Sequence, residues 1–358
     1  MRKLYSVLIM ALLVLSVAPA VLAVSVGSGV QPEITTEDFK PIVWLCDNRV
    51  VYDDATEPGR ISRDGTSMTE RVNNYAFEGE QVQWKVLVMD KNGINKVEDV
   101  FATIGSAQGA GNDIEANCVE DLGTTTILPA CNARILEENI TTFKPLVMRY
   151  YNCLLTVEPT MYGEYWITVE ATDLSGQSGT MDENEYWFLN PIIALSIDGT
   201  MSFDNVRPGT SSYSSTMLVG NDADASSAVM MDMFISGTDF YDSTSSGAMC
   251  PTSNQLKLEN FKYYTVNGAY STKQDPRADN EGYVSVGYGI GFNNPNTFYS
   301  TSPTTGYEIL HAAYDGTYWR ANTLAPGAEM AVTFKLNMPE PCNGNFDSGS
   351  IYFWGEAI

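Results

Sequence analysis

Histidine and basic residues are scarce in this sequence. His311 is the only histidine, and 20 Lys and Arg side chains stand against 44 Asp and Glu, which gives a net charge of −24. Proteins that bind nucleic acid carry a basic surface, so this balance excludes that class of partner. It also argues against electrostatic docking on anionic lipid. An acidic surface can attract divalent cations, so calcium is the one cofactor that we keep as a hypothesis.

Motifs of common hydrolases and of zinc sites are missing as well. A Ser-His-Asp relay would have to use His311, and no Gly-x-Ser-x-Gly segment is present. The six cysteines show no CxxC spacing, which argues against zinc. We interpret His311 as a strand residue with a local hydrogen bond and expect no enzymatic activity. The many carboxylates leave a glycosidase-like acid–base pair open as an alternative.

Only one long apolar run occurs, and it lies at the start of the chain. Two basic residues precede an apolar stretch at residues 4–17, and the small-residue sequence APAVLA follows. This order is typical of a secretory signal peptide, so we predict that residues 1–23 form one, with cleavage after Ala23 or Ala20. A retained anchor is the alternative, but the run is shorter than the ~20 residues of a spanning helix. We expect a secreted or cell-surface protein with no membrane span in the mature chain.

Cysteine usage fits an exported protein, because an even number of cysteines outside the cytosol indicates disulfides. The six are Cys46, Cys118, Cys131, Cys153, Cys250 and Cys342. Fifteen pairings are formally possible for six cysteines. Position in the sequence favours Cys118–Cys131, which flank one loop, and Cys250–Cys342, which lie together in the C-terminal half. Cys46–Cys153 then completes the set.

Apolar residues recur with period two after residue 38. In the segments 81–89 and 165–171 alternate side chains are apolar, as with Val82, Trp84 and Val86. Such alternation places one face of a strand on a core and the other toward solvent, as in antiparallel sheets. Turn signals such as Asn92-Gly93 separate the runs, and no long amphipathic helix stands out. The sequence therefore predicts an all-β protein.

Two segments of the first half resemble a known class of domain. The sequence DKNGI at residues 90–94 resembles a strand-turn-strand segment of secreted immunoglobulin-like domains. The sequence GEYWITVEATDLSG at residues 163–176 is similar to the penultimate strand of PKD-type and bacterial immunoglobulin-like domains, in which a tyrosine, here Tyr165, bonds to nearby backbone. The resemblance implies an immunoglobulin-like sandwich over residues 39–190. A long insertion at residues 105–139 departs from the pattern, and the expected Cys118–Cys131 bridge would hold it.

The second half resembles another group of surface proteins. The sequences FDNVRPG at residues 203–209 and TMLVGN at residues 216–221 resemble the opening of camelysin/TasA-like and archaeal surface β-sandwiches, some of which polymerise by donating a strand. Pro191 interrupts a strand ladder and marks the boundary. We therefore expect a flexible leader at residues 24–38 and two tandem antiparallel β-sandwiches. The second, at residues 191–358, would be immunoglobulin-like or jelly-roll-like.

Candidate ligand-binding residues come from a tyrosine-rich stretch at residues 261–319. From it we single out Tyr314, Tyr318 and Trp319, because exposed rings can stack on sugars or fill a partner's groove. The alternative is that strands are simply rich in aromatic residues. Asn139 is the only asparagine in an N-x-S/T sequon and is a candidate for glycosylation on an exposed loop.

Acidic clusters are candidate calcium ligands, although none has the spacing of an EF-hand. They are Asp222 with Asp224, Asp173 with Asp182, and Glu98 with Asp99. Solvated turns are the alternative interpretation of the same clusters. The identity of any metal is unknown from the sequence.

These features favour a structural protein of the cell exterior, of archaeal type, in an S-layer, a pilus-like filament or an adhesive coat. Its partners would be further copies or other surface proteins. Edge strands, or residues 24–30 of the leader, would complete a neighbour's sheet. A disordered linker is the alternative for the leader. The second hypothesis is a secreted carbohydrate- or peptide-binding module that uses the tyrosine-rich half, and a secreted hydrolase is the third.

Overall fold

The computed structural model describes ten parts of the chain, and the structural statements below concern these parts. They are residues 33–52, 69–108, 114–131, 135, 138, 140–181, 183, 185–289, 306–316 and 318–358. The chain forms two units, Met1–Asp38 and Phe39–Ile358, and every strand lies in the second. The expected signal peptide at residues 1–23, and residues 24–32 of the expected leader, lie outside the described residues.

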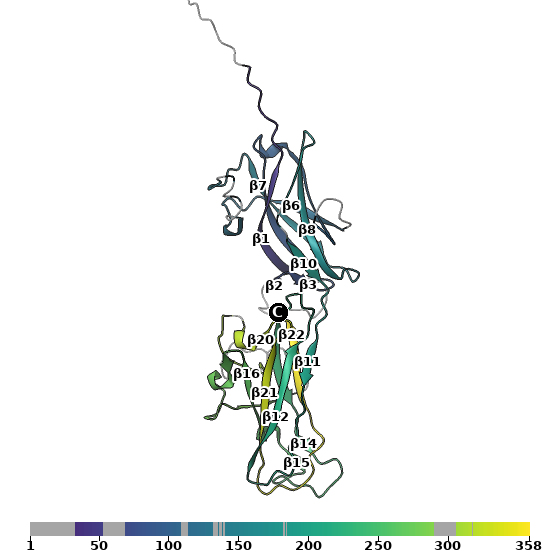
Figure 1. The fold of residues 1–358 in the computed structure, drawn as a ribbon, viewed down its shortest axis with the longest axis vertical. Helices are drawn as coiled ribbons and strands as arrows, with labels where there is room; N and C mark the ends of the chain where they lie inside the picture. Colours follow the sequence, from purple (N-terminus) through teal and green to yellow (C-terminus); the bar gives the residue numbers. More distant parts are fainter. Residues whose placement is uncertain are drawn as a thin grey trace, which may run out of the picture. The chain divides into compact units, whose positions relative to one another are not determined.

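In the described part of the chain before residue 190, ten strands pair into one continuous set (several are labelled in Figure 1). They are β1 (Ile42–Tyr52), β2 (Thr69–Val72), β3 (Tyr75–Ala76), β4 (Gln81–Met89), β5 (Val97–Gly105), β6 (Ile114–Asp121), β7 (Met148–Thr156), β8 (Gly163–Asp173), β9 (Ser178–Thr180) and β10 (Tyr186–Leu189). Their order is β2-β1-β4-β7-β6-β5-β8-β10-β3, with β9 beside β8. The short β5–β6 pairing, at Ala102–Ala116 and its neighbours, joins the two layers of a sandwich. All pairs are antiparallel except β10 with β3.

The core between these layers follows the period-two pattern. Val82, Trp84 and Val86 of β4 are at most 1 % exposed and pack in one cluster with Ile104 of β5 and Ile167 of β8. The face of each strand is therefore set by alternation, because successive side chains point to opposite sides of a sheet.

A second, smaller core covers the outer face of the same sheet. Leu87 of β4 breaks the expected alternation, since it is fully buried together with Trp44 and Tyr150 under the segment that follows β6. The Tyr150 hydroxyl accepts the N–H of Leu128 at 3.1 Å and donates to the carbonyl of Thr126 at 3.1 Å. These bonds hold the segment that connects β6 and β7 against the sheet, where it forms a third layer.

Twelve further strands lie in the residues after 194 that the structure describes. They are β11 (Leu195–Asp198), β12 (Ser211–Asn221), β13 (Met231–Gly237), β14 (Phe240–Tyr241), β15 (Gln255–Leu256), β16 (Phe261–Asn267), β17 (Tyr270–Ser271), β18 (Val284–Ser285), β19 (Gly287–Tyr288), β20 (Thr323–Leu324), β21 (Glu329–Asn337) and β22 (Ile351–Ala357). One sheet has the order β11-β12-β21-β16-β17, with β18 beside β16. The other has the order β19-β13-β20, with β22 beside β13, and β14 pairs with β15. Only β13 with β19 is parallel.

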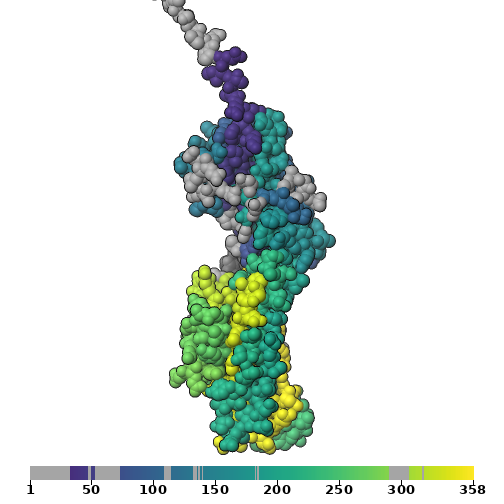
Figure 2. Space-filling view, viewed as in Figure 1, coloured from purple at the N-terminus to yellow at the C-terminus, as the bar shows by residue number. Residues whose placement is uncertain are grey.

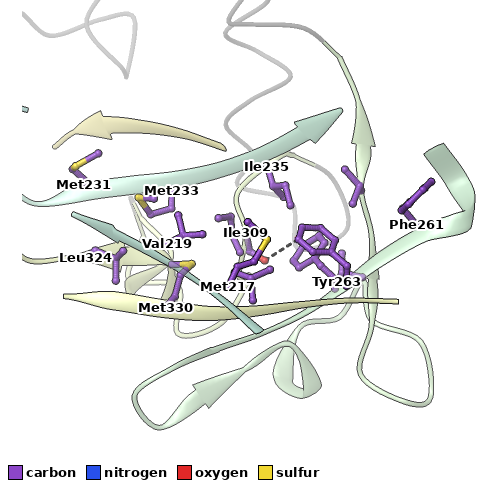
Figure 3. Packing of buried hydrophobic residues seen from close by; sticks show 14 of the residues in the cluster. Met217, Val219, Met231, Met233, Ile235, Phe261, Tyr263, Ile309, Leu324 and Met330 are labelled. Atoms are coloured by element: carbon purple, nitrogen blue, oxygen red, sulfur yellow. Dashed lines mark hydrogen bonds between the residues drawn. The ribbon is translucent and has the colours of Figure 1, made fainter. Parts of the chain in front are cut away.

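The core between these two sheets is rich in methionine (Figure 3). Val219 and Met330 come from one sheet, and Met231, Met233 and Ile235 come from the other. All five are at most 2 % exposed. Unbranched thioether side chains fill irregular gaps between sheets, which suits a sandwich whose second layer is built from short strands.

The expected all-β fold of antiparallel sandwiches is confirmed. Helical structure in the described residues is short: it consists of the single helical residues Ile135 and Glu138 and of 3₁₀ turns, namely η1 (Ile94–Lys96), η2 (Pro129–Cys131), η4 (Leu258–Asn260), η5 (Thr272–Gln274) and η6 (Arg320–Asn322). In the described parts of the chain, no strand before residue 190 pairs with a strand after it. The domain boundaries at residues 39–190 and 191–358 stay a prediction.

Two of the three expected disulfides are wrong. The structure joins Cys46 to Cys131 and Cys118 to Cys153, while Cys250–Cys342 is as expected. Cys118 and Cys153 are directly opposite each other on β6 and β7, with their Cα atoms 4.0 Å apart. Cys46 packs in the outer core with Cys131, whereas Cys153 packs in the inner one, so the expected Cys46–Cys153 bridge would have to cross the sheet.

Candidate functional site

Tyr314, Tyr318 and Trp319 come together in one tight turn after residue 313. Tyr314 and Trp319 form an isolated bridge, and Asp315 closes the turn by accepting the N–H of Tyr318 on its carboxylate at 2.8 Å. Trp319 is only 8 % exposed because its ring stacks on His311, with centroids 4.7 Å apart and planes 4° apart. Tyr314 is 37 % exposed, and its ring centroid is 4.7 Å from the ring centroid of Trp319. Most of the indole surface is used in packing, and ligand binding by these three residues stays a prediction.

His311 has the local hydrogen bond that the sequence suggested, but it lies between strands. Its Nε2 atom is 3.1 Å from a carboxylate oxygen of Glu308, and both side chains are at most 1 % exposed. Its backbone N–H donates to Asp275 at 2.9 Å. The imidazole is therefore enclosed by Glu308 and Trp319, with no exposed edge for a substrate.

Asp275 and Arg277 form a buried ion pair beside this histidine. The guanidinium donates to the carboxylate at 2.6 and 3.0 Å. The side chain of Arg277 is 11 % exposed and that of Asp275 is 0 % exposed. Arg277 also donates to the carbonyls of Gly306 at 3.2 Å and Glu308 at 2.8 Å. Desolvation would lower the pKa of Arg277, but Tyr263 and Asp275 outweigh it and raise that pKa.

A pocket of about 220 Å³ opens next to this pair. Its lining residues are Ile235, Tyr263, Arg277, Val284, Ser285, Gly287, Gly306 and Tyr307. Burial raises the pKa of Tyr263 to about 12, and its hydroxyl donates to the carbonyl of Ile309 at 2.8 Å. Tyr263, Arg277 and Tyr307 of the lining thus bond to carbonyls of the protein itself, and the bonds of Tyr263 and Arg277 support residues 306–309.

Three tyrosines gather on the outer face of the β12-β21-β16 sheet. Tyr213 of β12, Tyr264 of β16 and Tyr283 just before β18 form what we call the tyrosine platform, with Tyr213–Tyr283 and Tyr264–Tyr283 centroids 6.0 and 5.7 Å apart. Tyr213 is 53 % exposed. The three strands of this sheet, β12 (teal), β21 (yellow) and β16 (green), lie side by side in Figure 2.

Lys335 of β21 lies at the centre of the tyrosine platform. Its ammonium is 5.8 Å from the Tyr213 centroid and 5.4 Å from the Tyr283 centroid, and its side chain is 9 % exposed. It donates to Glu281 at 2.5 Å, a bond that raises the pKa of Lys335. The rings therefore cover a lysine whose charge is already neutralised.

Sequence reasoning counted Tyr264 and Tyr283 among many tyrosines and missed Tyr213. Tyr213 stands alone in a serine-rich stretch, SSYSST, where the β12–β21 register shifts between Tyr213 and Thr216. Its place opposite Lys335 on the outer face follows only from strand pairing. No feature of the sequence signals that contact.

The acidic clusters form no group of metal-ligand type among the described residues. The Asp173 carboxylate accepts the hydroxyl and N–H of Ser175 and the N–H of Gln177, bonds that lower the pKa of Asp173 and close the β8–β9 turn. The other described acids are exposed or half-buried: Asp222, Asp224, Glu98 and Asp99. Two candidate residues lie outside the described residues. They are Asp182, the expected partner of Asp173, and Asn139, the candidate glycosylation site. Calcium binding stays a hypothesis.

Two edge strands lie on one side of the second sandwich. β22 pairs only with β13, and β11 pairs only with β12, among the strands that the structure describes. A Cβ atom added to Gly355 of β22 would lie 3.7 Å from Leu195 of β11, so the two edges are neighbours. Ile351 and Phe353 of β22 are half-buried against the core. We call this pair of strands the β11/β22 edge.

None of the helices in the described residues has the length and apolar character needed to cross a bilayer.

Comparison with known proteins identifies no family. No family model matches the chain, and no curated protein matches it. Among solved structures, one titled BspA_C_mut is 9 % identical, with 90 % of this chain and 97 % of that chain covered and a TM-score of 0.28. The C-terminal domain of the Streptococcus agalactiae AgI/II polypeptide BspA is 7 % identical, with 89 % and 97 % covered and a TM-score of 0.27. The C-terminal domain of the Streptococcus pyogenes antigen I/II-family protein AspA is 8 % identical, with 90 % and 97 % covered and a TM-score of 0.20. All three TM-scores lie below 0.5, and at that level the similarity assigns neither a family nor a function.

Proposed function

We propose that this chain is a non-catalytic structural protein of the cell exterior that assembles with copies of itself or with other surface proteins. The assembly is an S-layer, a pilus-like filament or an adhesive coat, of archaeal type. Contacts form when a neighbour's strand extends a sheet of this chain. The donated strand comes from another edge or from residues 24–30 of the leader.

The observation that carries this proposal is the β11/β22 edge. Both strands have one side on which the structure describes no further strand. A strand at the end of a sheet presents a row of backbone N–H and C=O groups, and monomeric proteins usually blunt such edges with charges, prolines or bulges. β22 has the sequence IYFWGEA, with one charged residue and no proline. Main-chain hydrogen bonds from a neighbour's strand would extend this sheet by one strand.

The disulfides support a location outside the cytosol. All six cysteines are paired, and none is free. Reducing systems keep cytosolic thiols unpaired, so a chain with three bridges suits an oxidising compartment. Bridges also limit unfolding of a protein that no chaperone repairs after export.

Charge placed on the β22 edge tests the assembly. The mature chain, residues 24–358, is examined by analytical ultracentrifugation and negative-stain electron microscopy. Tyr352→Lys adds a positive charge to β22 next to the inward-packed Phe353, and we expect it to abolish oligomers or filaments formed by the unaltered chain. The matched control, Phe101→Lys, changes an aromatic residue that is 38 % exposed on β5, a strand that pairs on both sides, and leaves assembly intact. Equal assembly by Tyr352→Lys and the unaltered chain would show that this edge is not the contact.

Truncation separates the leader from the other possible donors. A chain that begins at Phe39 lacks the leader and retains every described strand. Loss of oligomers in this variant assigns the donated strand to the leader, and retention assigns it to another edge. Immunogold labelling of the native cell surface then tests the role itself: periodic label on a lattice or fibre is expected, and diffuse label in the medium contradicts it.

A further inference from the structure

The tyrosine platform is held in place by contacts within the protein. The Asp279 carboxylate accepts the N–H groups of Glu281 and Tyr283, both at 3.0 Å, which orders the turn that carries Tyr283. Gly282 in that turn has φ +92°, and a Cβ atom there would lie 3.2 Å from the Tyr264 ring. The turn therefore packs tightly against Tyr264. Rings ordered before a ligand arrives lose little entropy on binding, which favours recognition.

Two lysines beside the tyrosine platform are paired with carboxylates. Lys335 pairs with Glu281 at 2.5 Å, and Lys262 pairs with Asp279 at 2.7 Å. The chain as a whole carries −24 charges, so an anionic ligand is repelled by most of its surface. A ligand without net charge meets no such repulsion and does not have to compete for these paired charges.

Hydroxyl groups lie on the same outer face as the rings. Thr216 and Thr333 are directly paired, with their hydroxyl oxygens 3.1 Å apart, and Ser211 donates to the Asn337 side chain at 2.8 Å. A hydroxyl offers one donor and two acceptor positions, so each of these groups keeps capacity for a further bond. Tyr213 lies between the two pairs along β12.

We propose that the tyrosine platform binds neutral polysaccharide. Sugar rings present C–H faces that stack on the negative faces of aromatic rings, and hydroxyls that both donate and accept. The aromatic rings supply the first contact, and the Thr and Ser hydroxyls supply the second. A proline-rich peptide also docks on aromatic residues, but its prolines offer only carbonyl acceptors and leave the acceptor positions of this face unused. This binding goes beyond the proposed assembly and uses a different face from the β11/β22 edge.

The test is a titration of the mature chain, residues 24–358, with dextran, mannan, xylan and galactan by isothermal calorimetry and affinity electrophoresis. We expect saturable binding of at least one of the four. Tyr213→Ala weakens that binding about tenfold, because it removes the most exposed ring, whereas Tyr213→Phe keeps the ring and stays within about threefold. The control Tyr241→Ala removes a tyrosine on β14 that is 45 % exposed, and it leaves binding unchanged.

Several outcomes would overturn the proposal. They are no saturable binding of any of the four polysaccharides, equal binding by Tyr213→Ala and the unaltered chain, and equal loss in Tyr241→Ala. Binding of a proline-rich peptide in place of the sugars would also overturn it. Because Tyr213 is 53 % exposed, its replacement should leave the thermal melting curve unchanged, and the conservative Phe variant separates loss of binding from loss of fold. Assembly measured on the same variants stays intact, so the two proposals fail separately.

Discussion

Replacing Arg277 by alanine probes the buried ion pair next to His311. The Arg277 side chain is 11 % exposed, and the Asp275 carboxylate that it neutralises is 0 % exposed. The substitution leaves that carboxylate in the protein interior without a cation. It also removes the donors to the carbonyls of Gly306 and Glu308.

The expected loss of unfolding free energy is about 3–5 kcal/mol, the range for breaking a buried pair by removing one partner. The backbone N–H groups of His311 and Arg277 still donate to Asp275, both at 2.9 Å, which places the expected value toward the lower end. Adding Asp275→Asn removes the stranded charge. The double variant should therefore lose less stability than the sum of the two single variants, with a coupling of about 0.5–3 kcal/mol.

Urea unfolding followed by tryptophan fluorescence measures these differences. The matched control is Arg320→Ala, because Arg320 also pairs with an aspartate, Asp315 at 3.1 Å, but its side chain is 73 % exposed. Exposed pairs contribute about 0–1 kcal/mol, so the control should change little. A loss for Arg277→Ala no larger than that for Arg320→Ala would refute the assignment of a buried, desolvated pair.

Three further results are expected. Replacing both Cys250 and Cys342, which are 92 positions apart, by serine removes a constraint on the unfolded chain and should lower the free energy of unfolding by about 4–5 kcal/mol. Peptide mapping without reductant should recover this bridge, and full stability of the serine double variant would contradict its contribution. Hydrogen bonds from Lys85 and Thr124 lower the pKa of Asp121 in the folded protein. The ionised carboxylate therefore stabilises the fold at pH values above the pKa of Asp121 in the unfolded chain, and this stabilisation is lost as the pH falls through the lower pKa of the folded protein. The stability difference between the unaltered chain and Lys85→Ala should therefore be constant near neutral pH and shrink below about pH 4, as chemical unfolding at several pH values measures; a difference that grows in acid would contradict the pairing. Asn322→Ala removes bonds to the Asp232 carboxylate, the Met233 carbonyl and the Leu310 N–H and should cost at least about 2 kcal/mol in the same unfolding assay; a loss below half of that would show that these buried groups find other partners.

The period-two pattern was sufficient to place side chains on the correct face of a strand. Val82, Trp84 and Val86 are buried as expected, because alternation along an extended backbone is a local property. Leu87 was missed for the opposite reason. Its burial depends on the excursion between β6 and β7, which folds over the outer face and is not signalled by β4 itself.

The candidate sites were less accessible to sequence reasoning. Trp319 stands out by its residue type, but its stacking on His311 is a contact across the turn. Tyr213 lies in a serine-rich strand without a local pattern, and its value as a ligand contact arises because Lys335 and Tyr283 lie on the same face. Such contacts depend on the register of strand pairing, because a slip by one residue would move each side chain to the other face of the sheet.

The sequence by itself determined the fold class of this protein: an acidic chain with an even number of cysteines, in which local periodicity favours sheets. Tertiary structure alone decided which cysteines pair, which charges are buried and where the tyrosines meet. Cys46 and Cys153 show the physical reason. Each side chain's face follows from its own strand, but its neighbours follow from strand order and register, which distant segments of the chain set together.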